Sequence, residues 1–441
     1  MKKLFLLVLV ILALGVTMIA CAPAPEVPEP EAPVAEPADE PADEPEVEEV
    51  EEPAVEATGV TIEVATNVPG LQLEVLGEVI EEFIAETGIN VEFSVPGDGY
   101  EALMRTRMAT NDLPDVFSTH GWAVARYSPF LRPLNDQPWV SQLSPLIAPM
   151  ITCADGNVYV IPVDKDVGGI VYNRDILASL DIDVDDLVTW SDFEEALVIT
   201  RDAGYIPVFL GGADDWTIGQ FFNSVAPSYF ITNEAHNYQE ELLNGTFDWE
   251  LWAPLAEMFR DWNEAGFLNE DATTADYGTI TRELGQGNVA FALFGNYAIA
   301  DASAFGDANL GMMWIPALDP SDEPTLIAGE RLAMGVWKDT PHEEEALMFL
   351  EFLARPDIMA RLAEAGSMPA GFSGVYVDIG DVAQDIERYA DLRTFPYFDR
   401  VFLPSGMWDD MCNTGIGILN GSMSIEDVIR IMEESYLEKM D

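Results

Sequence analysis

Residues 60–95 read VTIEVATNVPGLQLEVLGEVIEEFIAETGINVEFSV, and this stretch decides the fold class. Apolar and polar residues alternate over 60–64, as in a strand with one buried face. Apolar residues then recur every three or four positions up to Gly88, as in an amphipathic helix, and alternation resumes over 89–95. A strand, a helix and a second strand with short connections form a βαβ unit. The stretch therefore predicts an α/β fold.

Polar motifs farther along the chain predict where other helices begin. Ser191-Asp192-Phe193-Glu194 resembles a capping box that opens a helix towards Ala203. Thr340-Pro341-His342-Glu343 combines a cap, a first-turn proline and a reciprocal glutamate before another helix. Ser424 precedes a last amphipathic helix.

The N-terminus has the pattern of a secretory signal. Lys2 and Lys3 precede a mainly apolar run that ends at Ala20, directly before Cys21. We expect residues 1–20 to be a signal peptide and Cys21 to carry the lipid of a bacterial lipoprotein, since Met18-Ile19-Ala20-Cys21 resembles a lipobox. A plain signal peptide or an uncleaved anchor is the alternative.

Residues 21–58 form the predicted tether. Residues 22–58 contain nine prolines and fourteen acidic residues but no Lys, Arg or aromatic residue. Such a composition cannot bury enough apolar surface to fold. The whole chain has a formal charge of −59, which excludes nucleic acid and an anionic lipid surface as partners.

Two cysteines remain after Cys21. An exported chain permits disulfides, so we favour a bridge between Cys153 and Cys412 over two buried free thiols, although the sequence does not show that they meet.

No recognised catalytic motif is present, and we expect neither enzymatic activity nor a cofactor. The three histidines are not part of H-E-x-x-H, and G-x-S-x-G and the P-loop pattern are absent. Asp181, Asp183, Asp185 and Asp192 have calcium-loop spacing, but Asp186 replaces the required glycine. We interpret them as an acidic loop before a helix and expect no metal site.

An ordered series of motifs resembles one known family. The most specific are Val158-Tyr159-Val160-Ile161-Pro162 with Tyr172-Asn173-Arg174-Asp175, and Gly287-Asn288-Val289-Ala290-Phe291 with Gly295-Asn296-Tyr297. Leu113-Pro114-Asp115-Val116-Phe117, Thr189-Trp190-Ser191-Asp192-Phe193, Ala328-Gly329-Glu330-Arg331 and Gly366-Ser367-Met368-Pro369 follow the same order. The series resembles the carbohydrate-binding, extracellular solute-binding proteins of ABC importers, the family that includes maltose-binding protein.

The resemblance implies the two-lobe periplasmic-binding-protein fold of type II, with the ligand in the interlobe cleft. The N-terminal lobe would comprise 59–165 and 325–372, and the C-terminal lobe 166–316 and 378–441. Hinge crossings are expected near 164–168, 317–325 and 368–377. A cleft of this kind closes by hinge motion.

A sugar site needs aromatic platforms and planar polar groups that bind hydroxyls. By their positions in the family motifs, Trp216, Tyr297 and Trp408 correspond to stacking aromatics, and Asp166 corresponds to an acidic sugar ligand. The other candidates align more loosely. They are Asn67, His120, Trp122, Asp214, Asp215, Asn296, Glu330 and Arg331.

These features together predict a lipid-anchored, monomeric protein that binds a sugar or oligosaccharide and passes it to an ABC permease. It would work outside the cytoplasm, in a periplasm or at an open cell surface. Two alternatives remain: a binding protein for a polyamine or another small solute, and a secreted carbohydrate-active enzyme. The sequence does not identify the sugar, its chain length or the permease.

Overall fold

The computed structural model describes residues 58–68, 70–121 and 123–440. The predicted signal peptide, the lipidation site Cys21 and nearly all of the tether lie outside the described residues. Trp122 lies outside them as well.

The predicted βαβ unit forms the beginning of a five-stranded sheet. Its strand order is β2-β1-β3-β11-β4, and β1 pairs in parallel with both β2 and β3. Strand β11 returns from late in the sequence and runs antiparallel to β3 and β4. The alternation is confirmed, because Ile62 and Val64 of β1 are fully buried. The strands are β1 (Thr61–Ala65), β2 (Asn90–Ser94), β3 (Val116–Ser118), β4 (Ile161–Pro162) and β11 (Ala333–Val336).

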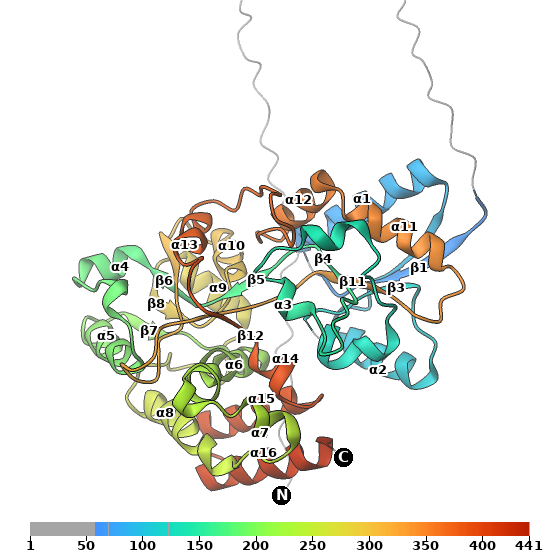
Figure 1. Cartoon of the computed structure of the whole chain (residues 1–441). Helices are drawn as coiled ribbons and strands as arrows, with labels where there is room; N and C mark the ends of the chain where they lie inside the picture. Colours follow the sequence, from blue (N-terminus) through green and yellow to red (C-terminus); the bar gives the residue numbers. More distant parts are fainter. Residues whose placement is uncertain (1–57, 69, 122, 441) are drawn as a thin grey trace, which may run out of the picture. The chain divides into compact units, whose positions relative to one another are not determined.

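Helices that cover this sheet come from both ends of the sequence (Figure 1). The apolar stripe of α1 packs on α12, and the Phe83 ring contacts Phe349 and Phe352 with centroids 5.1 and 5.5 Å apart. The chain therefore completes its first lobe only after residue 333. The helices of this part are α1 (Gly70–Thr87), α2 (Tyr100–Thr110), α3 (Ala148–Ile151), α11 (Glu343–Leu353) and α12 (Pro356–Ala365).

A second sheet has four strands in the order β7-β8-β6-β9. Its core is rich in aromatic rings, among them Phe193, which lies 4.7 Å from Phe291 and 5.8 Å from Trp262 between centroids. The strands are β6 (Ile170–Asn173), β7 (Ile206–Val208), β8 (Val289–Ala292) and β9 (Leu310–Met313). The helices are α4 (Arg174–Ser179), α5 (Trp190–Asp202), α6 (Trp216–Phe230), α7 (Gln239–Asn244), α8 (Ala253–Glu264), α9 (Tyr277–Gly285), α10 (Tyr297–Ser303), α13 (Val382–Arg388), α14 (Phe398–Phe402), α15 (Met407–Leu419) and α16 (Ile425–Met440).

A third, three-stranded sheet lies where the chain passes from one large sheet to the other. It has the order β12-β10-β5, with β5 (Asp166–Gly168), β10 (Leu326–Gly329) and β12 (Thr394–Pro396). Strand β5 connects β4 to β6, and β10 connects β9 to β11, so both cross between the large sheets. Buried Asp164 fixes the start of β5, because its carboxylate accepts hydrogen bonds from Gln72 of α1 and the Leu332 N–H.

The helix caps correct two of the predictions. Helix α5 begins at Trp190, and its capping box joins Thr189 to Asp192 rather than starting at Ser191. Helix α11 begins at Glu343 without a side-chain cap; the Thr340 hydroxyl accepts the His342 N–H, outside the helix, and donates to Asp115. The prediction at Ser424 is confirmed, because its hydroxyl donates to the Asp427 carboxylate and accepts from the Asp427 N–H at the start of α16.

The favoured disulfide is wrong. Cys153 and Cys412 are both free thiols. Each packs in its own surroundings: Cys412 is buried in α15 against Gly219 of α6, and Cys153 is half-buried and bonds to Ser128. The pKa of each thiol is raised, and burial is the largest cause.

The described residues contain neither a membrane-spanning helix nor a metal-binding cluster. Over residues 58–68, 70–121 and 123–440, no helix is long and apolar enough to cross a membrane. The same residues contain no group of three or more His, Cys, Asp or Glu side chains placed to hold a metal ion.

Candidate ligand-binding site

Six of the twelve sequence-predicted side chains meet around one cavity of about 280 Å³, which we call the inner cavity. Its walls come from the strand ends, from the starts of α6, α10 and α14, and from α15. Six of its ten lining residues were predicted from the sequence, namely His120, Asp166, Trp216, Tyr297, Arg331 and Trp408. The other four are Gln220, Asn223, Asp399 and Arg400.

Asp166 is the most distinctive polar group of the inner cavity. It is 4% exposed, and its Oδ2 accepts a hydrogen bond of 2.7 Å from the Tyr397 hydroxyl. Its Oδ1 is buried and has no hydrogen-bond partner. Burial raises the pKa of Asp166, whereas Arg400, the Tyr397 hydrogen bond and Arg331 oppose the rise. An unsatisfied buried acceptor is costly, which makes this oxygen a candidate acceptor for a ligand hydroxyl.

Glycine at position 295 permits this arrangement. A Cβ atom there would clash with Asp166 Oδ1 and with the Tyr297 ring. The turn that begins α10 can therefore approach β5 closely enough to place the tyrosine next to the carboxylate. This explains in physical terms why the Gly295-Asn296-Tyr297 turn needs its first residue.

The three aromatic residues come from the starts of three different helices. Trp216 and Tyr297 are the first residues of α6 and α10, and Trp408 is the second residue of α15. Trp408 packs against α6 at Gly219, where a Cβ would lie 3.1 Å from its ring. The Arg331 guanidinium lies 5.0 Å from the centre of the Tyr297 ring. Rings held in this way offer flat surfaces for the C–H faces of a sugar.

His120 adds a neutral hydrogen-bonding group. It follows β3 in a left-handed backbone conformation with φ of 42°. Burial, together with the positive charges of Arg400 and Arg331, lowers the pKa of His120 to about 3. The imidazole is therefore uncharged at neutral pH, and a hydrogen bond with the backbone of Arg331 holds it.

Sequence reasoning missed Gln220 and Asn223, although a signal for them existed. They stand four and seven residues after Trp216, so they share its face of α6. Both are buried; the Asn223 side-chain oxygen accepts a 3.0 Å hydrogen bond from the Asp399 N–H. Extending the face of Trp216 along the helix would have found both residues.

Asp399 and Arg400 had no such signal. They lie in α14, directly after β12, and reach the site because β12 pairs with β10. The Arg400 guanidinium packs over Gly121 and donates to the Glu330 carbonyl at 3.2 Å. A Cβ on Gly121 would clash with that guanidinium, and Gly121 has a φ of 79°.

Five predicted residues lie outside the wall of the inner cavity. Asp214 accepts the Tyr277 N–H at 2.8 Å and so orders the start of α9, while Asp215 is exposed before α6. Asn296 joins the lobes, because its side chain accepts the Val167 N–H and donates to the Ser367 carbonyl. Glu330 is buried beside the site, and Asn67 is half-buried next to Ser118.

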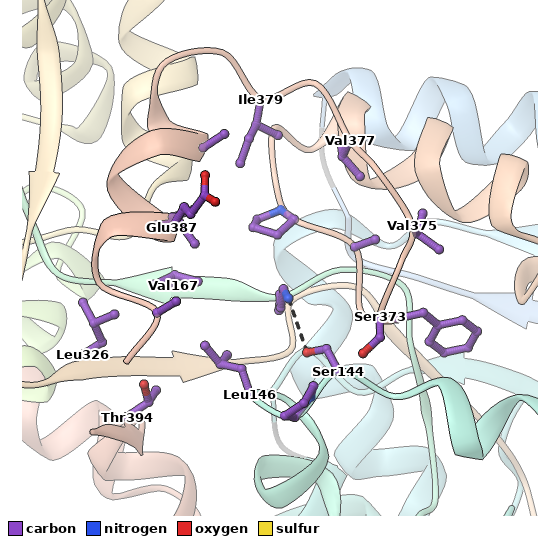
Figure 2. A pocket seen from close by; sticks show the side chains of 18 of the residues that line it. Ser144, Leu146, Val167, Leu326, Ser373, Val375, Val377, Ile379, Glu387 and Thr394 are labelled. Carbon is purple, nitrogen blue, oxygen red and sulfur yellow. Dashed lines mark hydrogen bonds between the residues drawn. The ribbon is translucent and has the colours of Figure 1, made fainter. Parts of the chain in front are cut away.

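A larger cavity of about 820 Å³ lies against the three-stranded sheet, and we call it the hinge cavity. Figure 2 shows aliphatic side chains such as Leu146, Leu326, Val377 and Ile379 around it. Lys165 is its main cation and donates to Ser144 Oγ at 3.3 Å (dashed line in Figure 2). A sugar needs several hydroxyl partners and stacking rings, and the inner cavity supplies these whereas the hinge cavity is mainly aliphatic.

The comparisons with known proteins agree with the geometry. Residues 71–360 match the model of the family described as "Bacterial extracellular solute-binding protein". The chain is 34% identical over 352 residues to the melibiose/raffinose/stachyose-binding protein MelE of Bacillus subtilis, covering 79% of this chain and 82% of MelE.

Two solved structures share the two-lobe fold. A binding protein, MsmE, of Bacillus subtilis in an open conformation is 32% identical with a TM-score of 0.81, covering 86% of this chain and 97% of its own. A sugar transporter protein of Bacillus licheniformis in complex with stachyose is 33% identical with a TM-score of 0.78. The match covers 86% of this chain and 100% of the Bacillus licheniformis chain.

Proposed function

The chain belongs to the bacterial extracellular solute-binding proteins, and on that premise we propose that it is the sugar-binding subunit of an ABC importer. It binds a sugar or oligosaccharide outside the cytoplasm and delivers it to the permease. Melibiose, raffinose and stachyose are the first ligands to test, because a relative with 34% identity is named for them.

The combination of groups around Asp166 is the observation that carries this proposal. Asp166, whose buried Oδ1 has no hydrogen-bond partner, lines the same inner cavity as three aromatic residues and a neutral histidine. Hydroxyl groups donate to the carboxylate, and the C–H faces of the ring stack on the aromatics. The ten lining residues are the ligand-binding residues that we propose.

Binding is coupled to a movement of the lobes in this proposal. The N-terminal lobe comprises 59–165 and 325–372, and the C-terminal lobe 166–316 and 378–441. The inner cavity is lined by residues of both, since His120 and Arg331 come from the first and Trp216 and Trp408 from the second. A ligand that contacts both lobes stabilises the closed form of the protein. The permease recognises this closed form.

The alternatives are less well supported. The inner cavity sets the two guanidinium groups of Arg331 and Arg400 against the carboxyl groups of Asp166 and Asp399, so it does not offer a polyamine an excess of negative charge. A carbohydrate-active enzyme needs a general acid and a second carboxylate on opposite sides of the scissile bond. The relatives are binding proteins, and we propose that this chain also has no catalytic activity.

Titration calorimetry tests the proposal directly. The protein is titrated with melibiose, raffinose, stachyose, spermidine and glycine. We expect saturable binding of at least one of the three sugars and none of spermidine. Saturation by spermidine alone would favour the polyamine alternative, and release of reducing sugar from stachyose over hours would establish an enzyme.

We further propose that the protein is a monomer anchored through lipid on Cys21, with residues 21–58 as a tether. The sequence pattern at 18–21 supports the anchor. Expression of the full chain and of Cys21→Ser in a bacterial host tests it. The unchanged chain is expected in the membrane fraction and the variant in the soluble fraction; a membrane-bound variant would indicate an uncleaved leader.

A further inference from the structure

A second hollow adjoins the inner cavity. It has a volume of about 1470 Å³, and we call it the outer groove. Trp216, Tyr297 and Arg331 line both hollows, so the outer groove begins where the inner cavity ends. One wall is the start of α1 with the segment after α12, and the other is α9, α10 and the loop that follows α10.

The aromatic surface continues from the inner cavity into the outer groove. The Tyr277 ring lies 4.8 Å from Trp216 and 6.4 Å from Tyr297 between centroids. Tyr277 lines the outer groove, and its hydroxyl donates to Asp301 at 2.8 Å. A ligand that extends from the inner cavity into the outer groove therefore contacts a further aromatic ring.

Phe305 stands on the same wall, and its side chain is exposed. Its side chain is 47% exposed, and Leu71 on the opposite wall is 60% exposed. Large apolar side chains in a groove next to a binding site often mark a contact with a ligand. Exposure of both residues has no reason in core packing, since neither belongs to a buried cluster.

The loop that carries Phe305 is held in place by close backbone packing. A Cβ on Gly306 would clash with the Gly285 carbonyl, and a Cβ on Gly285 would clash with the Ala302 carbonyl. The Phe305 N–H donates to the Ala302 carbonyl at 2.9 Å. The Ala308 N–H donates to the Gly285 carbonyl at 3.3 Å. Phe305 is thus presented on a fixed loop, which reduces the entropy lost when a ligand contacts it.

The size of the inner cavity requires such a continuation for long sugars. About 280 Å³ is near the lower end of ligand pockets, which begin at about 300 Å³. That space accommodates a terminal ring but not four rings. Any further rings of a bound oligosaccharide must lie elsewhere, and the outer groove shares three wall residues with the inner cavity.

We propose that the outer groove binds the second and later units of an oligosaccharide whose terminal ring occupies the inner cavity, with Phe305 as a stacking platform for a distal ring. This inference rests on the proposed function. It makes the protein selective for oligosaccharides over single sugars, because the outer groove adds affinity only when the ligand is long enough to reach it.

A nested series of ligands tests the inference. Melibiose, raffinose and stachyose have two, three and four rings and share a terminal galactosyl unit. Calorimetry compares the unchanged protein with Phe305→Ala, with Phe305→Trp as a variant that retains a ring. The control is Tyr376→Ala, which removes an aromatic side chain that is 83% exposed and lines the hinge cavity instead.

We expect Phe305→Ala to weaken stachyose about tenfold, as for loss of one stacked ring, and melibiose less than twofold. Phe305→Trp should retain stachyose binding, and Tyr376→Ala should leave all three ligands unchanged. Equal weakening of melibiose and stachyose by Phe305→Ala would overturn the inference and indicate a contact between closed lobes. Unchanged stachyose binding would overturn it as well. If the unchanged protein binds no sugar, the proposed function itself fails, which is a different result.

Discussion

The inner cavity and the hinge cavity lie on opposite faces of the same strand. Asp166, the first residue of β5, lines the inner cavity, whereas Lys165 before the strand and Val167 within it line the hinge cavity. Successive side chains of a strand point to opposite faces, so one strand separates the two hollows. The hinge cavity is almost three times larger, at about 820 against 280 Å³.

The chemistry of the wall, rather than the volume, favours the inner cavity as the ligand site. The inner cavity has a carboxylate oxygen without a partner, whereas the Lys165 ammonium of the hinge cavity already bonds to Ser144. We infer that the inner cavity is built for recognition and the hinge cavity for the packing of the crossing strands. Substitutions on the two faces should therefore separate binding from stability.

Asp166→Asn should have the largest effect. Asparagine retains the shape of the aspartate side chain but replaces the carboxylate with an amide. Hydrogen bonds to charged groups contribute about 1.5–3 kcal/mol each. We expect sugar affinity to fall about 100-fold by calorimetry. An affinity within threefold of the original would contradict the assignment of Oδ1 to a ligand hydroxyl.

The same variant has a pH signature. Burial raises the pKa of Asp166, so the native state holds this proton more tightly than the unfolded chain. The contribution of Asp166 to stability is therefore present below its unfolded pKa and is lost as pH rises through the raised value. In urea unfolding without ligand, Asp166→Asn should gain stability relative to the original protein between pH 4 and pH 7.

Leu326→Ala tests the other face of the comparison. Leu326 is 1% exposed on β10, lines the hinge cavity and belongs to a small core with Val167 and Met312. We expect the free energy of unfolding to fall by about 2.5 kcal/mol, because a buried leucine loses its packing. Sugar affinity should change less than threefold, and Leu326→Met, which conserves volume, should cost much less. A large loss of affinity in a stable Leu326→Ala protein would mean that the hinge cavity takes part in binding.

His120→Gln tests the electrostatics of the inner cavity. The pKa of His120 is lowered to about 3, so the unfolded chain binds a proton below about pH 6.5 and the native state does not. Stability from this group is present above pH 6.5 and is lost as pH falls towards 3. Between pH 7 and pH 5 the original protein should lose about 2 kcal/mol more than His120→Gln. Parallel pH profiles would show that the imidazole is not held in its neutral form.

These residues also show how far the sequence could lead. The alternation around Ile62 and the family motifs were sufficient for the α/β fold and for Asp166, Trp216 and Tyr297 at one cavity. Asp399 and Arg400 could not be predicted, because they reach the site through the pairing of β12 with β10, a contact about 70 residues distant in sequence. The disulfide failed for a related reason: cysteine spacing does not report which thiols meet in space.

Trp408→Ala should have a smaller effect than the substitutions above. The ring is one of three stacking surfaces, and loss of one should cost about 1.5 kcal/mol, or roughly tenfold in affinity. Trp408→Phe should recover most of the loss, because it retains a flat ring. Unchanged affinity in Trp408→Ala would remove α15 from the proposed site while leaving Asp166 in it.

Lys165→Met should have the smallest effect on binding and is the strictest test of the comparison. Lys165 is adjacent to Asp166 in the sequence but lies on the opposite face of the strand, so sugar affinity should stay within twofold, or about 0.4 kcal/mol. Burial lowers the pKa of Lys165, so the native state disfavours the proton and the ammonium costs stability at neutral pH. That cost disappears as pH rises towards the ordinary lysine pKa. The stability advantage of Lys165→Met over the original protein should therefore shrink from pH 7 to pH 10. A tenfold loss of sugar affinity would break the comparison, because it would show that the two faces of β5 act as one site.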